Sequence, residues 1–87
     1  MTVFMVERHL KGISMDALGA AQQAAIRQGK QMTMGGTPIR YIRSTFAPED
    51  GRCFCLFDGR SVADVRKLND DAKIPYTSVV EALDLTP

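Results

Sequence analysis

The stretch STFAPEDGRCFCLF, residues 44–57, decides the fold because it predicts two strands joined by a tight turn. Apolar runs flank Pro48-Glu49-Asp50-Gly51, in which proline presets φ and glycine accepts a positive φ. The second run carries both cysteines of the chain, Cys53 and Cys55, two positions apart. A β-hairpin is therefore predicted here, and the other elements are placed relative to it.

The flanking sequence predicts further strands and two helices. Serines at positions 14 and 61 are suited to cap the helices, which end by Gly35-Gly36 and by Pro75. The predicted strands cover residues 2–8, 39–46, 52–57 and 78–85. This βαββαβ order predicts a single α+β, ferredoxin-like domain over residues 1–87. Its four-stranded antiparallel sheet has the order 4-1-3-2, with both helices on one face.

Alternation along the strands divides the sheet into two faces. We assign the more apolar set to the core under the helices: Phe4, Val6, Ile42, Phe46, Phe54, Leu56, Val80 and Ala82, with Ser44 as its polar member. The other set mixes apolar and charged residues: Val3, Met5, Glu7, Ile39, Tyr41, Arg43, Thr45, Cys53, Cys55, Phe57, Val79, Glu81 and Leu83. Because such a face is too apolar for water, we expect a homodimer in which two sheets pack as an α+β barrel.

Composition excludes several classes of protein. The formal net charge is +1, so no basic excess indicates nucleic acid as a partner. No apolar run approaches the length of a membrane span, and Glu7, Arg8 and His9 interrupt the region that a signal peptide would need. The two cysteines are poorly spaced for a disulfide on one strand. A cytoplasmic protein with free thiols is expected.

The inter-sheet space of the expected dimer is the predicted ligand site. Its predicted lining is Met5, Glu7, Tyr41, Arg43, Cys53, Cys55 and Glu81, with His9 at the rim. Glu7 and Glu81 lie on strands that neighbour each other in the predicted order. Two close carboxylates would serve acid–base chemistry or a structural interface network.

His9 and the two cysteines have alternative interpretations. Imidazole suits nickel and zinc, so His9 is a candidate metal ligand; the alternative is a solvated residue at a strand end. Cys53 and Cys55 would bind a soft metal or act as reactive thiols if Arg43 or Arg52 lay beside them. The alternative is that both thiols simply fill the β interior.

Several motifs together resemble a known family. They are Glu7-Arg8 at the end of the first strand, the Tyr41–Phe46 strand, Phe54-Cys55-Leu56, and Ala72-Lys73-Ile74-Pro75 before Val79-Val80-Glu81. The chain resembles the small bacterial family of uncharacterised ferredoxin-like proteins that includes nickel-responsive, nickel-binding proteins. The resemblance implies a dimeric α+β barrel and, in some members, Ni²⁺ as ligand. Those members look rich in histidine, whereas this sequence contains His9 alone.

We therefore expect a small-ligand or metal-ion-binding homodimer. One alternative is a cofactor-free enzyme in which Glu7 or His9 is the base and Tyr41 or Arg43 holds a developing oxyanion. A second alternative is an interaction module whose bare sheet packs on another protein.

Overall fold

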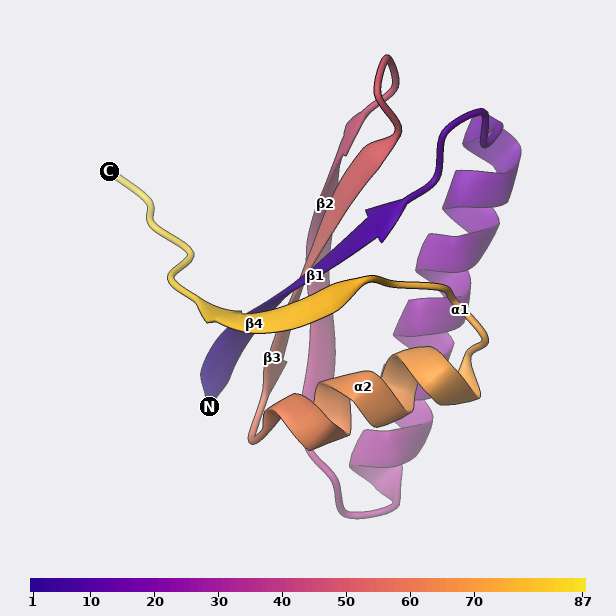
Figure 1. Cartoon of the computed structure of the whole chain (residues 1–87). Coiled ribbons are helices and arrows are strands. Elements are labelled where there is room, and N and C mark those ends of the chain that lie inside the picture. The colour runs from indigo at the N-terminus through magenta and orange to yellow at the C-terminus, as the bar shows by residue number, and fades with distance from the viewer.

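Six elements follow one another along the chain, and the computed structural model describes all of residues 1–87 (Figure 1). They are β1 (Thr2–His9), α1 (Met15–Met34), β2 (Ile39–Ala47), β3 (Arg52–Gly59), α2 (Val62–Asp71) and β4 (Ser78–Ala82). The βαββαβ order predicted from the sequence is confirmed. The last strand is shorter than predicted, because residues 83–87 leave the sheet.

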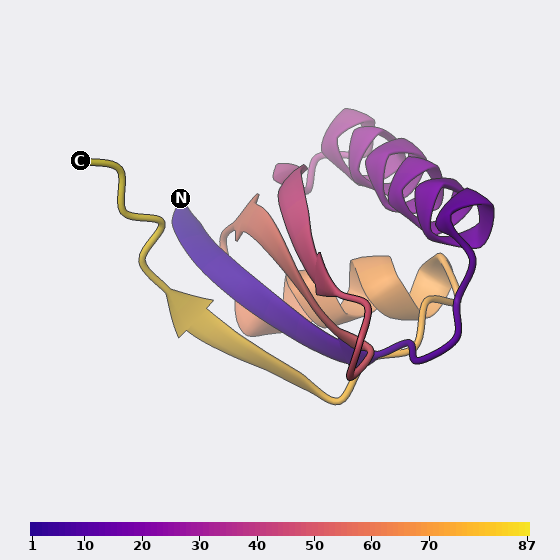
Figure 2. The ribbon, with the colours of Figure 1, turned by 90° about the horizontal axis from the view of Figure 1, so that it is seen from above.

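The four strands form one antiparallel sheet in the order β2-β3-β1-β4, as predicted. Both helices lie on the same side of this sheet (Figures 1 and 2). The opposite side, which we call the open face, carries no helix.

Serine caps begin both helices. The Ser14 side chain accepts a hydrogen bond from the Ala17 amide, and Ser61 accepts one from Asp64, each at 3.1 Å. These bonds satisfy amides that have no partner inside the helix. Gly35 follows α1 as its C-cap, as predicted. No helix of the protein combines the length and apolar character that crossing a membrane requires.

The hairpin turn between β2 and β3 is built around Gly51. Gly51 has a φ of +78°, and its amide donates to the Ala47 carbonyl at 2.8 Å. The Gly51 carbonyl accepts from the Leu10 amide at 2.7 Å, so the turn packs on the segment that follows β1. A Cβ atom at Gly51 would lie 2.5 Å from the Lys11 backbone. This close approach, together with the positive φ, explains why glycine occupies the position.

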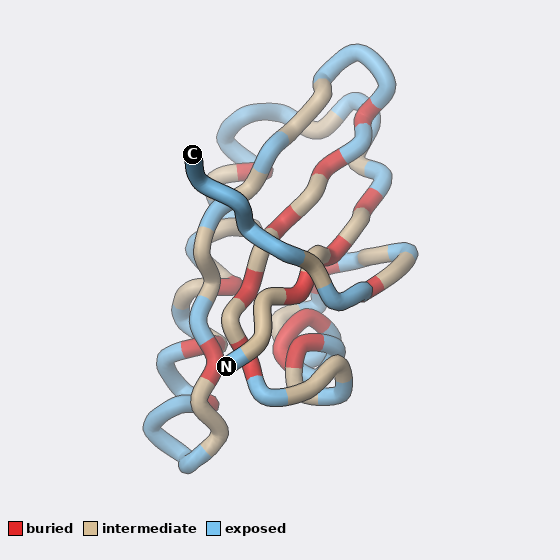
Figure 3. The backbone as a smooth tube through the Cα atoms, turned by 90° about the vertical axis from the view of Figure 1, so that its left-hand side faces the viewer, coloured by how far each residue is buried: buried red, intermediate tan, exposed pale blue.

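The core lies between the sheet and the helices. Buried and less buried residues alternate along the strands (Figure 3). The core cluster is Phe4, Val6, Leu18, Ala25, Met32, Ile39, Cys53, Cys55, Phe57, Val65, Leu68, Ile74 and Val79.

Candidate functional site

The open face has an apolar centre and a polar rim. Directly opposite residues in an antiparallel sheet share a face. Met5 faces Leu56 on one side and Val80 on the other. Val3, Phe54 and Ala82 extend this centre, and the rim consists of Glu7, His9, Arg40, Arg43, Thr45, Arg52, Asp58 and Ser78. The predicted mixture of apolar and charged side chains is present on this face, although with partly different residues.

The predicted orientation of β3 is wrong. Cys53, Cys55 and Phe57 point toward the helices and are 0%, 4% and 0% exposed, whereas Phe54 and Leu56 point to the open face. The register decides this, because Cys55 pairs with Val6 and Phe57 pairs with Phe4. The cysteines therefore do not line the open face.

β4 also differs from the prediction. Val79 is buried under the helices, and Val80 and Ala82 belong to the open face. Glu81 pairs with Phe4, while Glu7 pairs with Ser78. The two carboxylates therefore lie on opposite faces, and the predicted Glu7–Glu81 pair does not form.

A bulge divides β2 into two halves of opposite phase. The register shifts between Tyr41 and Arg43, which leaves Ile42 as the extra residue. Ile39 and Tyr41 therefore face the helices, contrary to the prediction, and Arg43 faces the open side as predicted. Tyr41 therefore cannot hold an oxyanion on the open face, whereas Arg43 lies on that face.

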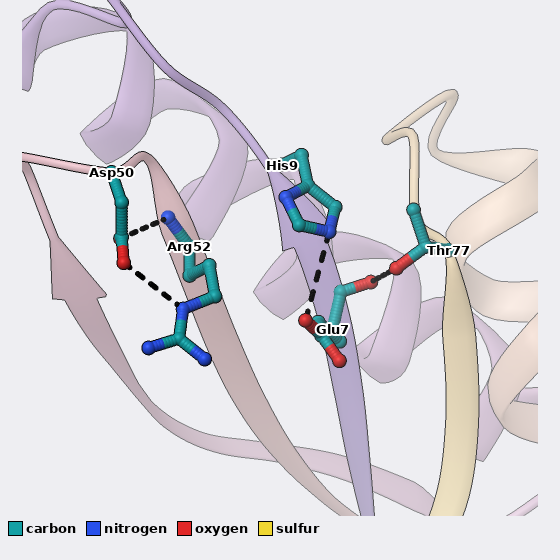
Figure 4. Close-up of polar contacts among 5 residues, drawn as sticks. All are labelled: Glu7, His9, Asp50, Arg52 and Thr77. Carbon is teal, nitrogen blue, oxygen red and sulfur yellow. Dashed lines mark hydrogen bonds and ion pairs between the residues drawn. The ribbon is translucent and has the colours of Figure 1, made fainter.

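Glu7 and His9 meet at one edge of the open face (Figure 4). His9 Nε2 lies 3.6 Å from Glu7 Oε2, and their side chains are 56% and 30% exposed. The Glu7 carbonyl accepts from the Thr77 amide at 2.8 Å and from Thr77 Oγ1 at 3.2 Å. These two bonds fix the backbone beneath the pair. An imidazole nitrogen and a carboxylate oxygen thus converge on solvent-accessible space.

Arg52 lies opposite His9 in the register of β1 and β3. Its Nε donates to Asp50 Oδ2 at 3.1 Å (Figure 4), and its guanidinium lies 5.9 Å from the Phe54 ring centre. The Arg52 amide, followed by the charge of its side chain, holds the pKa of Asp50 below its ordinary value. The charge of Arg52 is therefore balanced by Asp50.

Arg43 is occupied by the C-terminal tail. Residues 83–87 lie on the open side of the sheet (Figure 1), where Asp84 forms an ion pair with Arg43. Leu83 and Leu85 in this tail are 83% and 82% exposed. The tail thus adds apolar surface next to the open face.

A buried polar network, which the sequence pattern did not predict, lies on the helix-covered side. Arg8 is 2% exposed; its Nε donates to Cys55 Sγ at 3.3 Å and its Nη2 to Asn69 Oδ1 at 2.8 Å. Gln22 Nε2 of α1 donates to the Tyr41 hydroxyl at 2.8 Å, so this glutamine is a second polar side chain of the network. The spacing along β1 predicts that Arg8 faces the helices, since it follows Phe4 and Val6 at every second position.

Hollows in the surface lie away from the Glu7–His9 pair. The largest is a groove of about 560 Å³ between α1 and the start of β2, lined in part by Ile26, Met34 and Pro38 with Lys30. It belongs to the helix side of the molecule and to the opposite end of β1.

No group of three or more His, Cys, Asp or Glu side chains is placed to hold a metal ion within one chain. Glu7 and His9 are thus an incomplete set of ligands by themselves.

Comparison with known proteins points to one family. No curated protein matches the chain. The crystal structure of SCO4226 from Streptomyces coelicolor A3(2) superimposes with a TM-score of 0.81 at 23% identity, covering 98% of this chain and 99% of that one. This similarity supports the ferredoxin-like fold. The family model described as "Nickel responsive protein SCO4226-like" matches residues 4–82. The chain therefore belongs to the SCO4226-like family of nickel-responsive proteins.

Proposed function

We propose that this protein binds Ni²⁺ as a homodimer, with Glu7 and His9 as ligands at the rim of two packed open faces. The observation that carries the proposal is the 3.6 Å separation of His9 Nε2 and Glu7 Oε2 at the exposed end of β1. Imidazole nitrogen and carboxylate oxygen together suit Ni²⁺. The description of the family as nickel-responsive agrees with this choice of ion.

The number of donors supports a site shared between two copies. One chain offers two donors here, and none of its other His, Cys, Asp or Glu side chains completes a group of three. A two-fold dimer presents the same surface twice, so it supplies a second Glu7–His9 pair. Two imidazoles and two carboxylates would then surround one ion. Water would complete its coordination.

The apolar centre of the open face supports the dimer. Met5, Leu56 and Val80 lie in one row across three strands, and Val80 is 46% exposed. Packing two such faces removes this apolar surface from water, and sheets pack about 10 Å apart. The dimer thus stabilises the fold and brings the two rims together.

Nickel titration by calorimetry tests this function. Wild type is expected to bind one Ni²⁺ per two chains. His9→Ala and Glu7→Gln are expected to weaken binding at least about tenfold, because loss of even a second-shell partner costs about 10- to 100-fold in metal affinity. Glu81→Gln is the matched control, since Glu81 is an exposed carboxylate on the other face of the sheet. Unchanged affinity in His9→Ala, or no uptake by wild type, would refute the proposal.

A further inference from the structure

Arg8 is a buried cation that has no acidic partner. Its side chain is 2% exposed, and none of the ion pairs of the protein includes it. Its guanidinium donates to three uncharged groups: Cys55 Sγ at 3.3 Å, the Pro75 carbonyl at 3.3 Å and Asn69 Oδ1 at 2.8 Å. Burial of a charge is costly unless a counter-charge accompanies it. The interior therefore holds a positive charge beside a thiol.

Two thiols lie together next to this cation. Cys53 and Cys55 are both buried and free, and their sulfurs are 3.9 Å apart. Burial, and then the neighbouring Cys55, raises the pKa of Cys53 to about 11. Cys53 therefore keeps its proton at neutral pH unless a cation replaces it.

A chain of hydrogen bonds ends on Cys55. Gln22 Nε2 donates to the Tyr41 oxygen at 2.8 Å, which leaves the Tyr41 proton for Ser44 Oγ at 2.6 Å. The Ser44 proton is then free to point at Cys55 Sγ, 2.9 Å away. When the Tyr41 hydroxyl donates to Ser44 in this way, the Ser44 hydroxyl and Arg8 Nε both donate to the Cys55 sulfur. Such donors favour negative charge on the atom that accepts them.

We propose that Cys53 and Cys55 form a two-thiolate site for one soft monovalent cation of the Cu⁺ class, with Arg8 as its counter-charge. Thiolates select soft ions such as Cu⁺. On binding, both S–H bonds break, two S–Cu bonds form, and two protons leave to solvent, with no change in oxidation state. Two thiolates, one Cu⁺ and the Arg8 guanidinium sum to zero charge. The buried arginine thereby gains the anion that it lacks.

The geometry favours this ion over a disulfide or zinc. A disulfide bond needs sulfurs about 2.05 Å apart. The two sulfurs, which are 3.9 Å apart on one strand, would have to come much closer together to form it. Metal–thiolate bonds of about 2.3 Å, as in zinc sites, span the observed 3.9 Å between the sulfurs at an S–metal–S angle of roughly 115°, so both sulfurs can reach one ion. Zinc requires four ligands, and this interior offers two.

A copper titration under anaerobic, reducing conditions tests the site. Cu⁺ is supplied from its complex with a chromogenic chelator, and equilibration runs overnight because the thiols are buried. Wild type is expected to withdraw one Cu⁺ per chain, and Cys53→Ala and Cys55→Ala are each expected to lose this uptake. Excess Ni²⁺ is expected to leave Cu⁺ bound, since the rim pair is a separate site. Failure of the nickel titration alone would therefore leave this proposal intact.

The counter-charge is tested separately. Arg8→Met is expected to weaken Cu⁺ binding at least about tenfold, and Arg8→Lys less, because lysine keeps the charge near the sulfurs. Circular dichroism checks that each variant folds. For wild type, X-ray absorption supplies a measurement that needs no variant, and it is expected to show two sulfur ligands. No uptake by wild type, uptake that survives both cysteine substitutions, or a spectrum with nitrogen ligands overturns the site.

Discussion

Arg8 and Cys55 pair inside the protein: Arg8 Nε donates to Cys55 Sγ at 3.3 Å, with the two residues 2% and 4% exposed. The same guanidinium reaches Asn69 of α2, so one side chain joins β1, β3 and the second helix. The Ile74 amide donates to the Asn69 carbonyl at 3.0 Å, which holds the end of α2 against this arginine. The interior therefore contains a polar cluster of Arg8, Cys55 and Asn69 at a position where apolar side chains would be sufficient for packing.

Arg8→Met is expected to destabilise the protein because it leaves a neighbour without its donor. Asn69 Oδ1 would lose its 2.8 Å bond while remaining buried, at a cost of about 1–3 kcal/mol. Asn69→Leu in the Arg8→Met background removes the orphaned acceptor and is expected to recover part of this loss. Urea unfolding of the two single variants and the double variant measures the coupling. Strictly additive effects would contradict the dependence of Asn69 on Arg8.

The raised pKa of Cys53 predicts a loss of stability in alkali. Burial and the neighbouring Cys55 raise it from 9.0 to about 11, so the folded state retains the proton more firmly than the unfolded state. This contribution is complete below about pH 9 and declines as the pH rises towards 11. Urea unfolding under reducing conditions is expected to show wild type losing more stability than Cys53→Ala across this window. A pH-independent difference between the two proteins would contradict the assignment.

The element order and the pairing of strands were predictable from the sequence, because capping serines, turn residues and apolar runs mark each boundary. The sequence could not decide which side chains of β3 face the helices. Both alternating sets of its residues are apolar, and a one-residue shift of the strand exchanges the two faces. The length of the turn determines the faces of β3, because a four-residue Pro48–Gly51 loop places Phe46 opposite Cys53 and thus on the same face. The bulge at Ile42 then exchanges the two faces of β2 for the residues before it, and no residue near the bulge predicts this change.

The candidate site was predicted in part for the same reason. Met5, Glu7 and Arg43 lie on the open face, and His9 lies at its rim, because β1 and the second half of β2 were phased correctly. Tyr41, Cys53 and Cys55 lie on the helix side instead, because the faces of β3 and of the first half of β2 were predicted wrongly. Arg8 was overlooked because an arginine is seldom fully buried, although its spacing on β1 placed it there.

Gly51→Ala is expected to destabilise the fold. The new Cβ would lie 2.5 Å from the Lys11 Cα atom, and alanine would have to adopt a φ of +78°. The strained backbone alone costs about 1–3 kcal/mol, and displacement of the Lys11 segment adds to it. Gly19→Ala is the matched control: no atom lies within 4 Å of its Cβ position, and alanine favours the helix by about 0.5–1 kcal/mol. Thermal unfolding should therefore shift in opposite directions in the two variants.

Met5→Arg is expected to separate the proposed dimer. Met5 lies between Leu56 and Val80 at the apolar centre of the open face, so the substitution would bury an unpaired charge when two faces meet. A penalty of roughly 3 kcal/mol corresponds to a dimer weakened about 100-fold. Sedimentation equilibrium measures this change as a fall in mass towards that of one chain.

The control for this variant is Met34→Arg. Met34 is 88% exposed at the end of α1, outside the open face, so the same change of side chain is expected to leave the dimer intact. Far-UV circular dichroism should be the same for both variants, because neither position belongs to the buried core. A wild type that sediments as a monomer at micromolar concentration, or equal dissociation of both variants, would refute packing through the open face. In the first case the apolar row of Met5, Leu56 and Val80 would need another partner to cover it.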